Sequence, residues 1–412
     1  MTDQIYEALR NRVVSGHFLA GDCLPPSRKL AEELGVSRTT VVTAYEQLIA
    51  EGFAQGRVGS GIYISQIGEI ERLATPDTLL PEIPGGATNS PMPRPFLHGC
   101  PDPRLFPYRQ WAKCVTRVAR NNPEALVSTD EVFGDSALRK EICRYLKDWR
   151  GLSVNYRQVV ITAGAMDALE LCVRTLTSAN QGLLLEDPGY PPLHAFAVGL
   201  NIPVTCLKID PQGAEPPEAS THATPLTVLT PSSQFPLGGA MPLARRNAFL
   251  AWASENDAWL VEDDYDSEYR YAGRPIPALA GLDKQERTLY VGSFSKVFSN
   301  GLRIGFVVLP PGLITRFSAS LRRFGSKVSA LPQRPLALFM RGGEYYRHIR
   351  RARRIYAERR KTLIDLLHIH LGDLASFVDH RAGMQIAVKL PDQIKDTEVS
   401  KAAARKGIEC AA

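Results

Sequence analysis

The amino-acid sequence predicts a multidomain protein in which a small, mainly α-helical domain precedes a larger α/β domain with a mainly parallel sheet. In residues 1–65, apolar side chains recur every three or four positions, which is the period of a helix. Residues 66–95 hold six prolines and no regular period, as expected for an extended linker. In residues 96–412, short runs rich in Val, Ile and Leu alternate with helical patterns, which is typical of parallel α/β sheets.

Length and composition exclude several classes of protein. A chain of 412 residues with 44% hydrophobic residues can bury the cores of two or more domains, and its net charge of +6 does not by itself indicate a nucleic-acid partner. The seven cysteines are scattered without a C-x-x-C pair or a Cys/His metal spacing, which suits a reducing cytosol. The N-terminus lacks an apolar signal core, and no apolar run approaches the roughly 20 residues of a membrane span. These features predict a cytoplasmic protein without a membrane or metal partner.

The first 65 residues predict a winged helix-turn-helix. Helical spacing covers residues 2–15, and Ser27 is the expected cap of a short helix over 28–34. After a turn at Gly35, Ser37 caps a second helix that continues to about Glu51. Residues 53–64 then predict two short strands around a glycine-rich tip, which complete the wing.

A winged helix-turn-helix places the start of its second helix in the major groove of DNA, while the wing reaches the minor groove. Residues 1–65 carry six basic and seven acidic side chains, so a basic surface must come from their placement and from dimerisation. The alternative is a helical module that uses its hairpin for protein contacts. The predicted DNA-binding residues are Arg28, Ser37, Arg38, Thr39, Thr40, Arg57, Gly59 and Ser60.

Three stretches of this domain resemble the DNA-binding domain of GntR-family bacterial regulators: residues 24–31, residues 34–41 and the run Gly59-Ser60-Gly61. Ala44-Tyr45, Leu48 and Glu51-Gly52 fit the same pattern. The resemblance covers the whole segment and implies double-stranded DNA as a partner.

Unusual residues of the α/β domain fall at the carboxyl ends of its predicted strands, where ligands of such sheets gather. A small-residue turn at 162–169 opens a helix whose free N–H groups suit a phosphate. Residues 186–191 form a rigid turn that presents Tyr190. Residues 262–268 hold five acids in seven positions, for which a divalent metal is the alternative to a role beside Tyr265. The predicted strands are 158–162, 182–186, 226–230, 258–262, 288–292 and 304–309, with helices that include 165–177 and 242–255.

The fifth of these strands, 288–292, is followed by a lysine, Lys296, which lies between Ser293-x-Ser295 and Arg303. Burial lowers the pKa of a lysine toward the neutral, nucleophilic form that a Schiff base with a carbonyl cofactor requires. The two serines and the arginine are suited to hold a phosphate. A lysine in an exposed loop is the alternative.

Together these strand ends resemble the fold type I pyridoxal-phosphate (PLP) enzymes of the aminotransferase class. The resemblance implies that Lys296 forms the internal aldimine and that Asp263 pairs with the pyridinium nitrogen. It further implies that Tyr265 bonds the ring oxygen and that Tyr190 lies against the ring face. The residues that would hold the phosphate are Gly164, Ala165, Met166, Ser293, Ser295 and Arg303.

A GntR-type domain, a linker and an aminotransferase-like domain form the architecture of the MocR subfamily of GntR regulators, which residues 133–139 and 262–271 also resemble. This resemblance implies a homodimeric, PLP-dependent transcription regulator that senses an amine, an amino acid or PLP by transaldimination at Lys296. Two alternatives stay open. One is an active aminotransferase with a DNA-binding appendage, and the other is a DNA-binding protein whose larger domain serves only for dimerisation.

Several residues depart from the family pattern. Phe235 stands where aminotransferases usually have asparagine, Ser233 stands where the regulators often have histidine, and Met166-Asp167 replaces a more polar pair. The chain ends at Ala412, inside what resembles the first part of the small domain, so we expect an incomplete carboxylate clamp. Residues 341–361 hold nine basic and two acidic side chains, which predicts either a contact with DNA or an acidic partner, or a solvated helix face.

Overall fold

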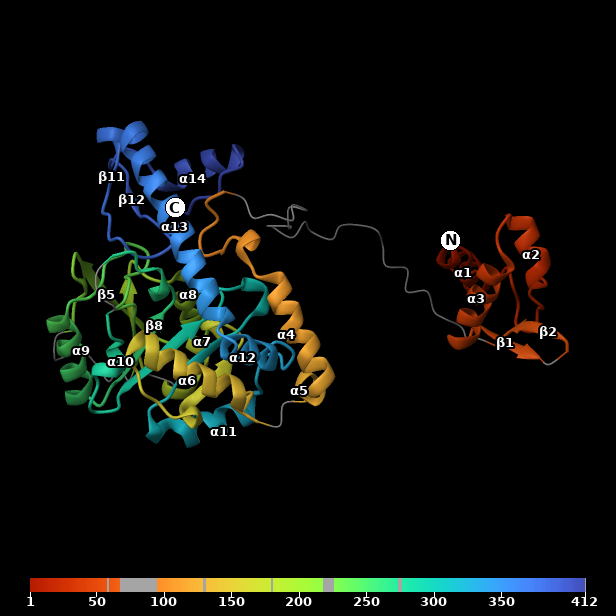
Figure 1. Cartoon of the computed structure of the whole chain (residues 1–412), viewed down its shortest axis with the longest axis horizontal. Coiled ribbons are helices and arrows are strands. Elements are labelled where there is room, and N and C mark those ends of the chain that lie inside the picture. Colours follow the sequence, from red (N-terminus) through yellow and green to blue (C-terminus); the bar gives the residue numbers. More distant parts are fainter. Residues whose placement is uncertain are drawn as a thin grey trace. The chain divides into compact units, whose positions relative to one another are not determined.

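The computed structural model of the chain describes residues 1–57, 59–66, 95–128, 131–178, 181–217, 226–272 and 276–411. The chain divides into two compact units, Met1–Thr88 and Asn89–Ala412 (Figure 1). We call residues 1–65 the head and residues 96–412 the body. The division falls inside the predicted linker, most of which lies outside the described residues, so the linker remains a prediction.

The head is a three-helix domain with a two-stranded wing, as predicted. Its elements are α1 (Thr2–Val14), α2 (Ser27–Leu34), α3 (Arg38–Ala50), β1 (Ala54–Arg57) and β2 (Gly61–Ile64). The apolar stripe of α3 fills the core, because Val41, Ala44 and Leu48 are fully buried against α1 and α2. The two strands pair antiparallel, and Gly35 supplies the left-handed turn (φ 63°) that ends α2.

The two predicted helix caps of the head have different outcomes. The side chain of Ser37 caps α3 by accepting a hydrogen bond from the Thr40 N–H at 3.2 Å, which confirms the prediction. Ser27 is not a cap, because α2 begins at Ser27 itself and the capping position is Pro26. Pro26 has no side-chain acceptor, so α2 begins without a side-chain cap.

The body is built on an eight-stranded, mainly parallel sheet with the strand order β3-β10-β9-β8-β7-β4-β5-β6. Strand β10 is antiparallel to both of its neighbours and β6 is antiparallel to β5, while the other pairings are parallel. The strands are β3 (Val159–Thr162), β4 (Leu183–Asp187), β5 (Val204–Asp210), β6 (Gly213–Ala214), β7 (Leu226–Leu229), β8 (Trp259–Asp264), β9 (Thr288–Ser293) and β10 (Gly305–Val308).

Helices cover both faces of this sheet. The helices of the body are α4 (Tyr108–Asn121), α5 (Glu124–Val127), α6 (Ser136–Arg150), α7 (Ala165–Leu176), α8 (Pro191–Gly199), α9 (Leu243–Glu255), α10 (Leu279–Leu282), α11 (Ile314–Phe324), α12 (Gln333–Arg341), α13 (Glu344–Leu371) and α14 (Asp396–Arg405). Short 3₁₀ turns occur at Pro103–Leu105, Tyr156–Gln158, Ser267–Tyr269, Asn300–Leu302, Pro311–Leu313 and Gly372–Leu374. None of the helices in the described ranges is long and apolar enough to cross a membrane.

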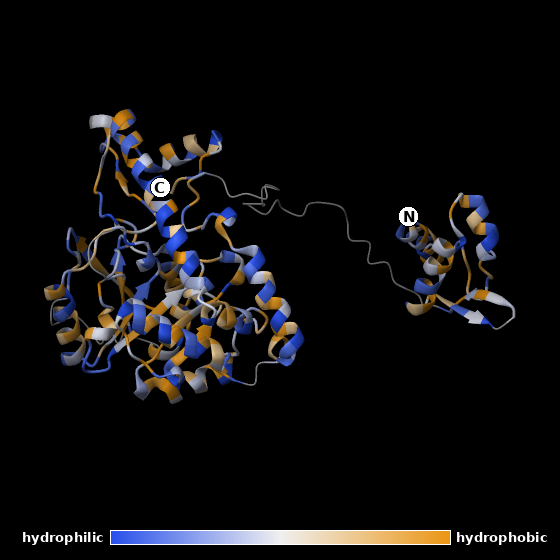
Figure 2. Ribbon diagram, in the orientation of Figure 1, coloured by the Kyte–Doolittle hydropathy of each residue, from blue (hydrophilic) through white to orange (hydrophobic). Residues whose placement is uncertain are grey.

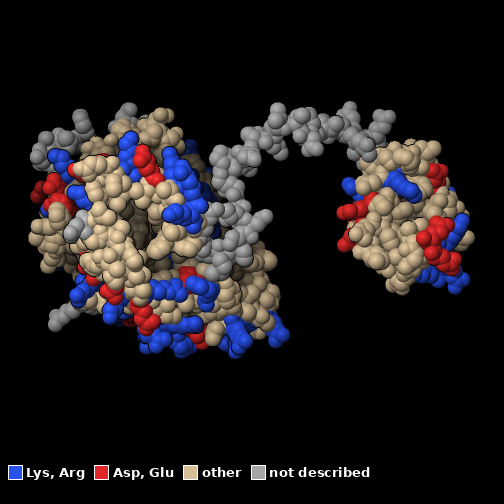
Figure 3. Space-filling view, turned by 90° about the horizontal axis from the view of Figure 1, so that it is seen from above, with Lys and Arg blue, Asp and Glu red and all other residues tan. Residues whose placement is uncertain are grey.

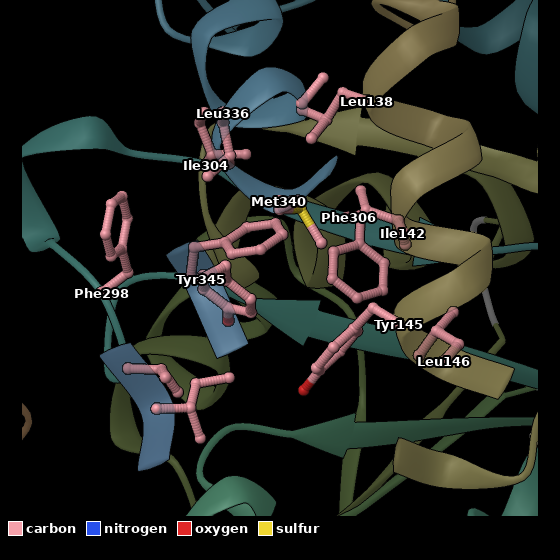
Figure 4. Close-up of a cluster of buried hydrophobic side chains, with 14 of the residues drawn as sticks. Leu138, Ile142, Tyr145, Leu146, Phe298, Ile304, Phe306, Leu336, Met340 and Tyr345 are labelled. Atoms are coloured by element: carbon pink, nitrogen blue, oxygen red, sulfur yellow. The ribbon is translucent and has the colours of Figure 1, made fainter. Parts of the chain in front are cut away.

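The alternation of side chains along the central strands sorts the core into two layers. On one face, Val261, Leu289 and Val291 pack with α7, α8 and α11. On the other face, side chains of α6, α12 and α13 pack on Phe306 of β10 and around Met340 (Figure 4). This apolar packing holds the carboxyl ends of β8 and β9 in place at one edge of the sheet.

The C-terminal part of the body is small. After α13 come the two-stranded sheet of β11 (Ser376–Phe377) and β12 (Val388–Lys389) and then α14. Helix α13 is mainly hydrophilic on the side in view in Figure 2, and it connects this part to the core. Its first half buries Tyr345, His348, Ile349 and Ala352, whereas its second half buries no residue among those described.

Candidate functional site

The predicted lysine lies at the edge of the sheet where the parallel strands end. Lys296 follows β9 by three residues and is half-buried. Burial lowers the pKa of its amine, while the carboxyl groups of Asp263 and Asp266 oppose that shift by stabilising the charged form. Lys296 is thus not the exposed loop lysine of the alternative reading.

Asp263, near the end of β8, is a buried carboxylate with an unused oxygen. Only 7% of the residue is exposed, and its Oδ1 has no hydrogen-bond partner among the described residues. Desolvation raises the pKa of Asp263 to about 7; Asp264 and Glu186 add to the shift, and Lys296 counteracts it. A buried acceptor without a donor is costly, so the site fits a ligand that brings a positively charged N–H, such as a pyridinium nitrogen.

Two tyrosines and a phenylalanine line the same region. Phe235 lies between Tyr190 and Tyr265, with both ring centroids 5.8 Å from its own and both contacts edge-to-face. The Tyr265 hydroxyl donates to Ser233 Oγ at 3.3 Å. Phe235 and Ser233, two of the departures from the family pattern, therefore touch the predicted site residues. Burial raises the pKa of Tyr190, the nearby Asp263 carboxylate adds to this rise, and the Arg303 guanidinium opposes it. Tyr190, Asp263 and Arg303 therefore lie near one another.

The predicted phosphate residues converge from two chain segments. Gly164 is the N-cap of α7 at φ 96°, and Ala165 and Met166 form the first turn. A Cβ on Gly305 would lie 2.6 Å from the Gly164 carbonyl carbon and 2.9 Å from the Ala165 nitrogen. Gly305 also pairs with Ser293 in the β9–β10 register, so Ser293 lies beside the N-terminus of α7. A helix N-terminus with adjacent hydroxyls is suited to a phosphate.

Ser295 and Arg303 are the remaining residues of the predicted phosphate-binding set. The Ser295 N–H donates to Ser293 Oγ at 3.1 Å, which folds the chain back after β9. Arg303 adopts a left-handed conformation (φ 50°) and is exposed; its N–H donates to the Asn300 carbonyl, and its side chain makes no hydrogen bond or ion pair with the described residues. Its guanidinium is therefore available for a ligand anion.

An ion-pair network fixes β8 behind the site. Arg150 of α6 pairs with Asp264 at 2.8 Å and lies 3.6 Å from Glu262, and it donates to Ser232 Oγ at 2.6 Å. The Tyr290 hydroxyl also donates to Asp264, at 2.5 Å. Glu262 and Asp264 of β8 thus point to Arg150. Asp263 lies between them in the chain, so its side chain points to the opposite face of the sheet, toward Lys296. Among the described residues, no group of three or more His, Cys, Asp or Glu side chains is arranged to hold a metal ion.

The sequence interpretation missed several groups at the site. Gly99 lies against the lysine: a Cβ there would be 1.9 Å from Lys296 Nζ. The neighbouring Cys100 and the lysine amine also influence each other's pKa. Asp266 is buried, and burial raises its pKa to about 7. Asp266 belongs to the acidic run after β8, which was a usable signal, but no local pattern places residues 99–100 near Lys296.

Basic residues of the 341–361 stretch are largely paired within the body. Five of the nine contact it or their own helix: Arg341–Glu141 at 3.1 Å, Arg347–Glu344 at 2.7 Å, Arg353 to the Glu268 carbonyl at 3.0 Å, Arg359–Asp102 at 2.9 Å and Arg360–Asp379 at 2.7 Å. The other four, Arg350, Arg351, Arg354 and Lys361, are exposed. The view in Figure 3 shows Lys and Arg in groups on the body, with acidic side chains beside some of them.

The predicted DNA-binding residues lie at the start of the two helices and on the wing of the head. Arg28, Ser37, Arg38 and Thr39 are exposed, and Thr40 is half-buried. Arg38 Nε lies 3.4 Å from Ser27 Oγ, which joins the two helix starts. On the wing, Arg57, Gly59 and Ser60 are exposed. The Arg57 guanidinium lies over the Tyr63 ring at 4.5 Å, and Ser60 Oγ is 2.7 Å from the Tyr63 hydroxyl.

Comparison with known proteins identifies the family of each unit. Residues 1–64 match the family of bacterial regulatory proteins named gntR, and residues 106–410 match the aminotransferase class I and II family. The chain therefore joins a GntR DNA-binding domain to an aminotransferase domain. It is 35% identical to the probable rhizopine catabolism regulatory protein MocR of Rhizobium meliloti, over 99% of this chain and 85% of that protein. It is 36% identical to the pyridoxine biosynthesis regulator PdxR of Corynebacterium glutamicum, over 98% and 86%.

The chain belongs to the MocR-type transcription regulators. Solved structures agree on the fold of the body. An archaeal alanine:glyoxylate aminotransferase covers 79% of this chain and 81% of its own length with a TM-score of 0.71 at 24% identity. The kynurenine aminotransferase of Pyrococcus horikoshii, solved with PMP, covers 78% and 81% with a TM-score of 0.69 at 25% identity.

Proposed function

We propose that the body of this regulator binds PLP at Lys296 and senses an amine, an amino acid or PLP itself, and that the response alters DNA binding by the head. The observation that carries the proposal is the buried, unpaired Oδ1 of Asp263 beside a lysine whose pKa is lowered by burial. A family relationship alone supports an aminotransferase-like domain, whereas this pair of groups supports a working cofactor site.

Each residue of the site has a specific part in this proposal. The cofactor, when bound, supplies an aldehyde that a lysine amine can capture and a ring that withdraws electrons. Burial lowers the pKa of the Lys296 amine and so favours the neutral form that a nucleophile needs. Asp263 would pair with the ring nitrogen and keep it protonated, and the Tyr265 hydroxyl would bond the ring oxygen. Tyr190 would lie against the ring face.

The phosphate would be held by groups with complementary charge. The backbone N–H groups at Gly164, Ala165 and Met166 belong to the free first turn of α7, which favours an anion. Hydroxyls of Ser293 and Ser295 add neutral donors, and the exposed Arg303 guanidinium supplies the positive charge. None of these phosphate contacts uses the Lys296 amine itself.

A direct test uses the purified 412-residue chain and the DNA upstream of its own gene. We expect fluorescence anisotropy to show a DNA affinity that changes when PLP is added, and that changes again when one of a panel of amines and amino acids displaces Lys296. Sustained conversion of amino donors and keto acids would favour the alternative, an active aminotransferase. Binding that is indifferent to PLP and to every amine would contradict the proposal and favour a body that serves only for dimerisation.

Arg38→Ala in the head is expected to weaken DNA binding. Arg38 is exposed at the first turn of α3, where a helix-turn-helix meets DNA. If it contacts a phosphate, the variant should lower the salt dependence of log K by about one charge, and if it reads a base it should cost about 1–3 kcal/mol. Titrations at several salt concentrations distinguish the two. Arg12→Ala, on the exposed side of α1, is the control, and an unchanged affinity for Arg38→Ala would exclude this docking mode.

A further inference from the structure

The chain segment that leads into the body forms one wall of the Lys296 site. Gly99 has φ 68°, and a Cβ at that position would overlap Lys296 Nζ at 1.9 Å, so the backbone of Gly99 lies directly on the amine. Cys100 is half-buried beside it. Pro95, at the start of the same segment, accepts a hydrogen bond from the Glu409 N–H at 2.9 Å. The wall is therefore a short strap, residues 95–100, tied at its first residue to the C-terminal part.

The strap is anchored at its other end by Asp102. The Asp102 carboxylate pairs with Arg359 of α13 at 2.9 Å and with Arg104 at 2.7 Å. It also caps the Pro103–Leu105 turn, because it accepts the Arg104 N–H at 2.9 Å. The Asp102 N–H in turn donates to the Tyr356 hydroxyl at 2.8 Å. The Asp102 side chain is only 8% exposed, so solvent screens the Arg359 pair less than an ordinary surface ion pair.

One face of α13 contacts both the loop that carries Lys296 and the end of the strap. His348, Ala352, Tyr356 and Arg359 follow the spacing of one helical stripe. At its first position, His348 Nε2 lies 2.9 Å from the carbonyl oxygen of Val297, the residue after the lysine. At its last two positions, Tyr356 and Arg359 hold Asp102. The lysine loop and the strap are thus registered against the same rigid element.

We propose that Asp102 is a positioning residue of the Lys296 site, which holds the Gly99–Cys100 strap against the lysine by fastening it to α13. The inference rests on the proposed function only in that Lys296 is the reacting group. Asp102 does not itself touch the amine; it acts through the backbone of residues 99–100.

The test uses the 412-residue chain with Asp102→Ala. We expect hydrogen exchange of residues 95–102 to become about tenfold faster or more, because the strap opens locally. Without its cover, Lys296 becomes more hydrated and its pKa rises toward the ordinary value. The pH midpoint for trapping PLP on Lys296 with borohydride should therefore move upward by about one unit.

Matched variants make the result specific. Arg359→Ala should act in the same direction but more weakly, because the Asp102 carboxylate still caps the Pro103–Leu105 turn, and it provides the test if Asp102→Ala fails to fold. Arg347→Ala, on the same helix and paired with Glu344, should leave both readouts at the wild-type value. Unchanged exchange and an unchanged midpoint in both Asp102→Ala and Arg359→Ala would overturn the proposal, as would lower stability with an unchanged midpoint. If wild-type protein traps no PLP, the proposed function fails, and the exchange data still decide the role of Asp102.

Discussion

Asp263→Asn is expected to make the protein without cofactor more stable above pH 7 and, at the same time, to weaken its binding of PLP. The carboxyl group has a pKa of about 7 in the folded protein and about 3.9 in an unfolded chain. The folded state therefore binds more protons between these values, and wild type loses stability as the pH rises through this window. A shift of about three units corresponds to at most about 4 kcal/mol, which the amide variant no longer loses.

Chemical unfolding of wild type and Asp263→Asn between pH 5 and pH 8 measures this difference. Asp264→Asn is the matched control on the same strand. Asp264 pairs with Arg150, so its replacement leaves a buried guanidinium without its nearest charge and should destabilise the protein by about 3–5 kcal/mol. If both variants change stability in the same direction, Asp263 is not the unpaired group described above.

Bound PLP should make the ionised form of Asp263 favourable, whereas without PLP burial makes it unfavourable. Once a positively charged N–H lies beside Oδ1, the carboxylate gains its missing partner and the ionised form becomes favourable. An amide at this position cannot supply that charge, so we expect PLP to bind about tenfold or more weakly to Asp263→Asn, a loss of about 1.4 kcal/mol or more. Equal affinities would show that Asp263 has no role in holding the ring.

Lys296→Ala is expected to abolish covalent capture of PLP. After incubation with PLP and reduction by borohydride, wild type should carry one cofactor at Lys296, which peptide mass spectrometry would locate. The Ala variant should carry none at this site, because no other lysine amine is held near Asp263 by the described structure.

Lys327→Ala is the control for this experiment. Lys327 is an exposed lysine paired with Glu170 at 2.7 Å, and we expect its replacement to leave labelling at the wild-type level. The DNA affinity of Lys296→Ala should no longer respond to amines. Equal labelling of the wild-type and Lys296→Ala proteins at other lysines alone would reject Lys296 as the capture site.

Much of the fold could be predicted because it is encoded locally. The predicted strands at 226–230 and 288–292 differ by one residue from β7 and β9, and the helix at 165–177 differs by one from α7. Short apolar runs and small-residue turns are local signals, and the strand ends that carry Tyr190, Asp263 and Lys296 follow from them. The head was equally accessible, since α3 has both a cap residue and a regular apolar stripe.

Features that depend on long-range contacts could not be read in this way. The place of β10 between β9 and β3 depends on its pairing with β3, whose residues are more than 140 positions earlier. The contact of Gly99 with Lys296 joins segments separated by almost 200 residues, and nothing near Gly99 indicates it. Ser27 fits a cap by residue type, but the helix starts one residue early, after Pro26. Propensity predicts which element forms more reliably than where its first residue lies.

Because α13 is one continuous helix, a small tilt at its N-terminal end displaces its C-terminal end by a larger distance. The helix has 28 residues without an interruption, and His348 lies near its first end beside the lysine loop. From His348 to Leu371 the axis extends by about 35 Å, so a tilt of about 5° at the lysine loop would carry the far end through about 3 Å. Arg359, which holds the strap, lies about halfway along this arm. A movement of the lysine loop that is too small to disturb the core would thus displace the C-terminal end of α13 by a distance comparable to the length of a side chain.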